Sequence, residues 1–168
     1  FLSRRLTRAA KLAAQRIDVM LVTHMIHVRY LSNVSGSNGA LLVQKDLSGL
    51  IATDGRYLTQ IAEEVPDIEV IEARDCAVGL LGHIQGPRRV GYEADYVSVQ
   101  QLKKLQEACP EDVTLVPVTG VIEQIRLTKD AVERERLAKV AELANTSLQE
   151  LIAAGELRAG RSEIEVAA

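Results

Sequence analysis

The sequence predicts an α/β domain in which helices flank a mixed sheet of five or six strands. Two observations predict this fold class. Short runs of aliphatic and β-branched residues alternate with segments of helical periodicity along most of the chain. Two of these runs, 39–44 and 49–53, are separated only by residues 45–48, which favours an antiparallel hairpin over a purely parallel sheet. Aromatic residues make up 3% of the chain, so Leu, Ile, Val and Ala must build the core.

The predicted elements follow one another with short connections. Strands are predicted where β-branched and aliphatic residues cluster, at residues 18–23, 39–44, 49–53, 68–71, 89–92 and 113–118. Helices are predicted in segments of helical spacing, at residues 3–16, 57–65 before Pro66, 78–84 before Gly86-Pro87, and from the capping box Ser98-Val-Gln-Gln101 onward. Residues 1–126 are therefore expected to form one domain.

The character of the sequence changes after Ile125. A long helix is predicted from the cap signal Asp130 with Glu133 to Gly155, and Ser162 opens another helix shortly before the chain ends. One face of the long helix is apolar and comprises Leu137, Val140, Ala141, Ala144, Leu148, Leu151 and Ile152. We expect residues 127–168 to be a linker helix and the start of a further domain. The uncovered apolar face predicts self-association through residues 131–153.

Charge and composition exclude several classes of protein. The net charge of −3 and the pI near 5.7 differ from the basic surface of a nucleic-acid-binding protein. No run of 18 apolar residues occurs, so we expect no membrane partner. The basic start lacks a continuous apolar block, so no signal peptide is expected. Cys76 and Cys109 lack metal-site spacing, which favours a reducing, cytoplasmic location.

The candidate motifs do not form a catalytic constellation. His24 and His27 lie three residues apart, but no further ligand is near, and their segment reads as a strand end and loop. The stretch 35–39, SGSNG, resembles a phosphate loop in composition only, because a strand follows it. Asp54-Gly-Arg-Tyr57 reads as a turn between strand and helix, with Asp54 as a helix cap. We therefore expect neither catalytic nor metal-binding residues in this chain.

Six segments in order carry a resemblance to a known family. They are IDVMLVT (17–23), HVRYLSNVSGSNGALLV (27–43), TDGRY (53–57), VGYEADYVS (90–98), IRLTKDAVERERLAKVAELAN (125–145) and LRAGRSEIEVAA (157–168). Together they resemble the N-terminal domain of the creatinase/prolidase/aminopeptidase P family, the pita-bread metallopeptidases, and most of all a bacterial Xaa-Pro dipeptidase or aminopeptidase. The resemblance covers nearly the whole chain, and its strength lies in the order and spacing of the segments.

The resemblance implies a non-catalytic module of a longer enzyme. In the family, a catalytic domain follows, where two Asp, one His and two Glu hold two divalent metal ions, here expected to be manganese, cobalt or zinc. A bridging hydroxide attacks the amide before proline. None of those ligands can be assigned in this chain, so we expect it to be inactive alone. Its expected partners are its own catalytic domain, a second copy in a homodimer, and proline-containing peptides.

The family also implies a role for the long polar loop at 32–38, which lies near the catalytic pocket of the partner protomer. The residues expected to line that pocket are Arg29, Tyr30, Asn33, Val34, Ser35, Ser37 and Asn38. Arg29 can pair with a peptide carboxylate, which would favour dipeptides. The family usually has Asn in place of His27, and Gly-Phe in place of Asn33-Val34. Asn33 can still adopt the left-handed backbone that a Gly would supply.

Two alternatives stay open on the sequence alone. The chain can be the N-terminal module of a creatinase-type amidinohydrolase, because the loss of an aromatic at Val34 removes a stacking surface for a prolyl ring. It can also be a non-catalytic protein-binding module, as in histone-chaperone relatives of this fold.

Overall fold

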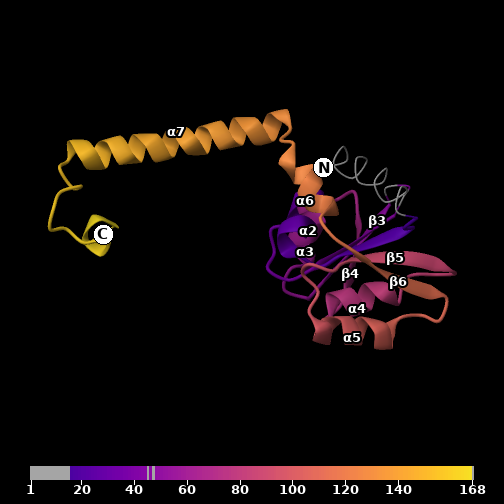
Figure 1. The fold of residues 1–168 in the computed structure, drawn as a ribbon. Helices are drawn as coiled ribbons and strands as arrows, with labels where there is room; N and C mark the ends of the chain where they lie inside the picture. Colours follow the sequence, from indigo (N-terminus) through magenta and orange to yellow (C-terminus); the bar gives the residue numbers. More distant parts are fainter. Residues whose placement is uncertain (1–15, 45, 47, 168) are drawn as a thin grey trace. The chain divides into compact units, whose positions relative to one another are not determined.

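The computed structural model describes residues 16–44, 46 and 48–167, which form two compact units with a boundary between Arg126 and Leu127 (Figure 1). The helix predicted at 3–16 lies outside the described residues, except for Arg16.

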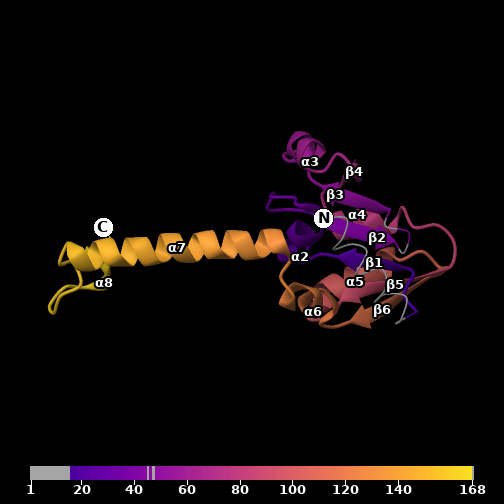
Figure 2. The same cartoon turned by 90° about the horizontal axis from the view of Figure 1, so that it is seen from above.

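The first unit is built on a mixed sheet of six strands, as the sequence predicts. The strands are β1 (Val19–Val22), β2 (Ala40–Gln44), β3 (Gly49–Thr53), β4 (Glu69–Glu72), β5 (Arg88–Glu93) and β6 (Val113–Val118). Their order is β4-β3-β2-β1-β5-β6, which can be followed down the right-hand part of Figure 2. The predicted hairpin makes β2 antiparallel to β1 and β3, and the other neighbouring pairs are parallel.

Five described helices cover the two faces of this sheet. They are α2 (Met25–Ser32), α3 (Leu58–Glu64), α4 (Cys76–Leu81), α5 (Val99–Ala108) and α6 (Val121–Leu127). Helices α2, α3 and α6 lie on one face, and α4 and α5 lie on the other (Figure 1). The first unit is thus a three-layer α/β/α domain.

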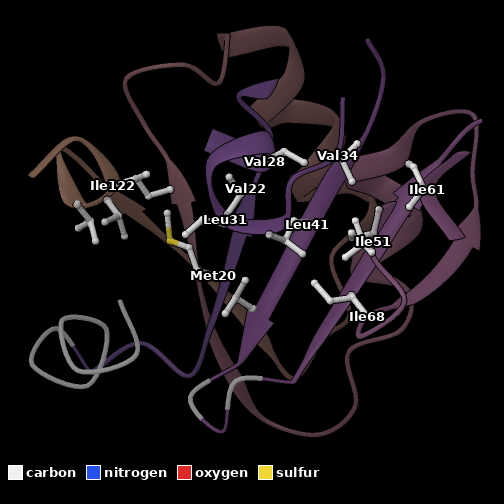
Figure 3. Close-up of a cluster of buried hydrophobic side chains, with 14 of the residues drawn as sticks. Met20, Val22, Val28, Leu31, Val34, Leu41, Ile51, Ile61, Ile68 and Ile122 are labelled. Carbon is white, nitrogen blue, oxygen red and sulfur yellow. The ribbon is translucent and has the colours of Figure 1, made fainter. Parts of the chain in front are cut away.

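The central strand β1 explains why both faces need helices. Its four residues are all buried and alternate between two hydrophobic clusters. Met20 and Val22 point into the cluster under α2, α3 and α6 (Figure 3), whereas Val19 and Leu21 face α4 and α5. A strand buried on both sides reads as a continuous apolar run, as VMLV does.

Several predicted boundaries were wrong. The segment from His24 was expected to be a strand end and loop, but α2 begins at Met25. The buried positions of α2 include the polar residues His27 and Ser32, so the hydrophobic period that marks a helix is weak there. Helix α6 was not predicted, and α4 spans Cys76–Leu81 rather than 78–84, because Asp75 caps it through the Val78 N–H.

The second unit contains α7 (Ala131–Ala153) and α8 (Glu163–Ala167). The predicted capping box is present: Glu133 N–H donates to Asp130, and the Glu133 carboxylate accepts from Asp130 N–H. Gly155, with φ of 69°, follows the end of α7 in the left-handed region. No residue of α7 is buried. Among the helices in the described part of the chain, none combines the length and apolarity needed to cross a membrane.

Candidate functional site

The candidate site lies at the edge of the sheet where the parallel strands end. Strands β1, β3, β4, β5 and β6 share one direction, so the segments that follow them meet at this edge. Antiparallel β2 begins there, preceded by the α2–β2 loop, defined here as residues 33–39. In open α/β sheets this edge is the usual place for ligand contacts.

The α2–β2 loop begins with a left-handed residue. Asn33 has φ of 78° and ψ of 2°, and its N–H donates to the Arg29 carbonyl over 2.8 Å. The expectation that Asn33 supplies a glycine-like turn is therefore confirmed. The next side chain, Val34, is fully buried in the core under α2 and α3 (Figure 3). Val34 thus supports the loop from beneath, while Ser35 and Ser37 are exposed.

The first half of the loop is tied to α3. The Ser35 N–H donates to Glu64 Oε2 over 2.8 Å, and its hydroxyl donates to Glu64 Oε1. Gln60 Nε2 donates to Ser35 Oγ over 2.7 Å and to Glu64 Oε1 over 2.9 Å. The hydrogen bond from the Ser35 hydroxyl, followed by that from Gln60, lowers the pKa of Glu64 below its ordinary value. The charge of Arg29 adds a smaller effect in the same direction.

The tip of the loop rests on Tyr57, which follows β3. The hydroxyls of Ser37 and Tyr57 lie 2.7 Å apart. A Cβ added to Gly36 would lie 3.2 Å from the Tyr57 ring, so a side chain there would crowd the aromatic face. Arg56 is 5.2 Å from the centroid of the same ring.

The second half of the loop is tied to Asp54. Asn38 Nδ2 donates to Asp54 Oδ2 over 2.7 Å, and Thr53 Oγ1 donates to the Asn38 carbonyl over 2.9 Å. Arg56 donates to Asp54 through its backbone N–H and its guanidinium. Arg56, followed by Asn38, holds the pKa of Asp54 far below its usual range. The prediction that Asp54 caps the next helix was wrong, since Tyr57 occupies the N-cap position of α3 and Asp54 organises the turn instead.

The seven residues predicted to line a pocket thus fall on one continuous segment. Arg29 is exposed on the last turn of α2, and the half-buried ring of Tyr30 lies 5.9 Å from the Arg126 guanidinium. Sequence reasoning missed Gln60 and Glu64, because carboxylates and amides on a short helix look like solvated surface. Tyr57 belongs to the TDGRY motif, but no local sequence pattern predicted its hydrogen bond to Ser37.

Two clefts flank Asn38 at this edge. One, of about 510 Å³, is lined by residues that include Asn38, Cys76 and Lys104, and the other, of about 660 Å³, by Asn38, Asp54, Arg56 and Arg74. Burial, followed by the charges of Asp54 and Asp75, raises the pKa of the Cys76 thiol. This thiol is therefore a poor nucleophile.

A second polar group, the His27 cluster, lies at the start of α2 and comprises His24, His27, Glu93, Tyr96 and Glu123. His27 is fully buried, and its Nδ1 lies 2.6 Å from Glu93 Oε1. Glu93 Oε2 accepts from the N–H groups of Thr23 and His24, over 2.7 and 2.9 Å. Glu93 therefore caps a helix whose own N-cap residue makes no side-chain bond.

The other ring nitrogen of His27 faces Glu123 on α6. His27 Nε2 lies 3.8 Å from Glu123 Oε1 and has no hydrogen-bond partner within the described chain. His24 stacks on the Tyr96 ring with 4.0 Å between centroids. Burial alone would raise the pKa of Glu123. Hydrogen bonds from its own backbone and Tyr96, with the charges of His27 and Arg126, outweigh burial and lower it.

Metal ligands are not assembled at either place. Within residues 16–44, 46 and 48–167, no group of three His, Cys, Asp or Glu side chains is arranged to hold a metal ion. The described residues therefore do not fit the metal pair that the resemblance implies.

Known proteins match this chain over most of its length. Residues 4–128 match the model of the Creatinase/Prolidase N-terminal domain. The uncharacterized peptidase YqhT of Bacillus subtilis (strain 168) is 30% identical over 154 residues, which are 90% of this chain and 42% of that protein. The N-terminal, creatinase/prolidase-like domain of a Corynebacterium diphtheriae protein is 60% identical, with a TM-score of 0.70 over 71% of this chain and 96% of that one.

Two further structures agree in fold. The N-terminal domain of the cytoplasmic peptidase PepQ from Mycobacterium tuberculosis H37Rv is 40% identical, with a TM-score of 0.69, and the match covers 73% of this chain and 98% of that one. The Xaa-Pro dipeptidase from Bacillus anthracis is 25% identical, with a TM-score of 0.84, and the match covers 99% of this chain but 46% of the dipeptidase. The chain thus spans less than half of the longer relatives YqhT and this dipeptidase. The predicted resemblance is confirmed: the chain belongs to the creatinase/prolidase N-terminal domain family.

Proposed function

We propose that this chain is the non-catalytic N-terminal module of a cytoplasmic, dimeric Xaa-Pro metallopeptidase, in which the α2–β2 loop of one protomer borders the substrate pocket of its partner. Relatives with this domain include a protein described as an Xaa-Pro dipeptidase and one described as a cytoplasmic peptidase. The catalytic domain, with two divalent metal ions such as manganese, cobalt or zinc, would supply the polarised carbonyl and the activated water.

The anchoring of the α2–β2 loop carries this proposal. Three loop residues are held by side chains that lie between the end of β3 and the end of α3. Ser35 bonds to Glu64, Ser37 to Tyr57, and Asn38 to Asp54. A loop held in this way loses little conformational entropy when it meets a ligand. Its exposed serines can narrow an entrance without moving.

Arg29 supplies the specificity in this proposal. It is exposed on the turn of α2 that leads into the loop, and its guanidinium carries a permanent positive charge. A dipeptide with Pro at its second position places its terminal carboxylate next to the scissile bond. Pairing of this carboxylate with Arg29 would favour dipeptides over longer chains.

The test uses the full-length protein that contains this chain. We expect Arg29→Ala to raise KM for Xaa-Pro dipeptides by about tenfold or more, because one charge-assisted hydrogen bond to the substrate carboxylate is lost. The effect on longer Xaa-Pro peptides should be smaller. Arg88→Ala is the matched control, because Arg88 is also exposed but lies where β5 begins, at the opposite edge of the sheet. An unchanged KM for dipeptides would refute the role of Arg29, and hydrolysis of creatine in place of peptides would refute the substrate class.

A further inference from the structure

The larger-walled of the two clefts beside Asn38, of about 510 Å³, lies where neighbouring strands send their helices to opposite faces of the sheet. Strands β1 and β5 are parallel neighbours. Helix α2 follows β1 on one face, and α5 follows β5 on the other (Figure 1). The cleft is lined by Thr23, directly after β1, and by Gln101 and Lys104 on α5. In open α/β sheets, such a divergence at the carboxyl ends of the strands opens a crevice that binds ligands.

The floor of this cleft is apolar and built from small residues. Gly39, Ala40 and Ala77 line it and are buried, and none of them has a side-chain atom beyond Cβ. Met25 also lines the cleft and adds a flexible apolar side chain. The volume lies within the range of roughly 300–1,000 Å³ that is usual for small-molecule sites. The floor therefore fits a compact aliphatic group.

Three charged side chains line the same cleft: Arg74, Asp75 and Lys104. The Asp75 carboxylate accepts from the Val78 N–H as the cap of α4, and it lies 3.4 Å from Lys104 Nζ. The side chains of Lys104 and Asp75 are 55% and 45% exposed, so this ion pair is weak and leaves Lys104 able to turn toward a ligand. Two positive charges against one negative charge leave one positive charge in the cleft without a counter-charge.

Arg74 is the group that lacks a counter-charge. It lies between β4 and α4, is exposed, and makes no ion pair or hydrogen bond with another described residue. It also lines the second cleft that flanks Asn38, whose carboxylates are Glu72 and Asp54, the latter paired with Arg56. A guanidinium binds a carboxylate through two parallel N–H donors, so Arg74 is suited to hold one.

We propose that this cleft binds a small aliphatic monocarboxylate, with the carboxylate on the Arg74 guanidinium and the hydrocarbon part against the apolar floor. Lys104 and the Gln101 amide would supply further donors. The single uncompensated positive charge favours a monoanion over a dianion such as hydrogen phosphate, because Asp75 would repel the second negative charge. Every residue that lines the cleft belongs to one copy of the chain, so binding requires neither a catalytic domain nor a second protomer.

Titration of the 168-residue chain with butyrate, followed by NMR of the backbone amides, tests this site. We expect saturable shifts of the Gly39, Ala40 and Ala77 amides, with a Kd on the order of 1–10 mM for so small a ligand. Arg74→Gln should weaken butyrate binding about tenfold or more, because a charge-assisted pair is lost. Arg88→Gln is the matched control and should bind butyrate like the parent, since Arg88 is also exposed but lies where β5 begins, at the opposite edge of the sheet.

Two further ligands separate carboxylate recognition from simpler causes. Butyramide has the shape of butyrate without its charge, and hydrogen phosphate has charge without the aliphatic part. We expect each to bind about tenfold more weakly than butyrate. Because Arg74 is exposed, Arg74→Gln is expected to fold, which unchanged amide shifts outside the cleft will verify.

Three results would each overturn the proposal. The first is the absence of saturable shifts with butyrate. The second is equal butyrate affinity in the parent and in Arg74→Gln. The third is butyramide or hydrogen phosphate binding as tightly as butyrate, which would show a merely apolar hollow or a general attraction for anions.

Discussion

The Asn38 side-chain amide donates a 2.7 Å hydrogen bond to the Asp54 carboxylate, which joins the loop before β2 to the turn after β3. The same carboxylate accepts from Arg56, so one acidic group organises both segments. This arrangement depends on Asn38 being a donor. An acceptor at the same place would turn the contact into a repulsion.

Asn38→Asp tests this contact with almost no change of shape. Because Asp54 stays ionised to unusually low pH, the new carboxylate would face a like charge, and we expect a lower free energy of unfolding at neutral pH. The loss should shrink in acid, where the new carboxyl group is protonated and can donate. Urea denaturation at both pH values measures this. Asn145→Asp on exposed α7 is the control and should show little change; a similar loss there would contradict the assignment.

Ser35→Ala tests the anchor on α3. The pKa of Glu64 is depressed, mainly by the Ser35 hydroxyl, so this stabilisation is fully present above the ordinary glutamate pKa of 4.5 and is lost as the pH falls through the lower folded value. We expect Ser35→Ala to destabilise the chain at neutral pH, and the difference from the parent to vanish in acid. Ser147→Ala on α7 should show no such pH dependence in the same denaturation series. A difference that is constant with pH would mean that Ser35 acts only through packing.

Substitutions of Asn33 test the left-handed turn at the start of the α2–β2 loop. With φ of 78°, we expect Asn33→Gly to be neutral or slightly stabilising, because glycine has no Cβ to disfavour this region. We expect Asn33→Ala to cost about 1 kcal/mol, because alanine keeps the Cβ but lacks the short polar side chain that lets asparagine adopt the left-handed region. Thermal unfolding of the two variants gives the comparison. Equal stability of the Gly and Ala variants would show that the backbone at this position relaxes.

The apolar face of α7 is expected to drive self-association. Val140 and Leu148 are 63% and 49% exposed, and they belong to the stripe that the sequence predicts. We expect the chain to sediment as a dimer or larger species, and Val140→Glu with Leu148→Glu to shift it toward monomer. Thr146→Glu with Ala153→Glu adds the same charge on the opposite side of α7 and should leave the assembly unchanged. A parent chain that stays monomeric at high concentration would contradict the expectation.

The sequence predicted the sheet better than the polar sites. Strands such as β1 and β2 are continuous apolar runs, and the short connection after Gln44 requires a hairpin, so their number and mixed pairing follow from local pattern. Helix α2 could not be predicted in the same way, because its buried face carries His27, whose partner Glu93 lies 66 residues away. The link between Ser35 and Glu64 is likewise long-range and leaves no trace in local sequence.

The proposed placement of the α2–β2 loop beside the partner's pocket is tested most directly by cross-linking in the full-length protein. A photoreactive amino acid in place of exposed Ser37, in dimers mixed from isotopically light and heavy protomers, reports which chain the loop touches. We expect cross-links from the loop of one protomer to the catalytic domain of the other, suppressed by an Xaa-Pro dipeptide, and none from the same probe in place of Arg88. Cross-links confined to a single protomer, or insensitive to the dipeptide, would contradict the account.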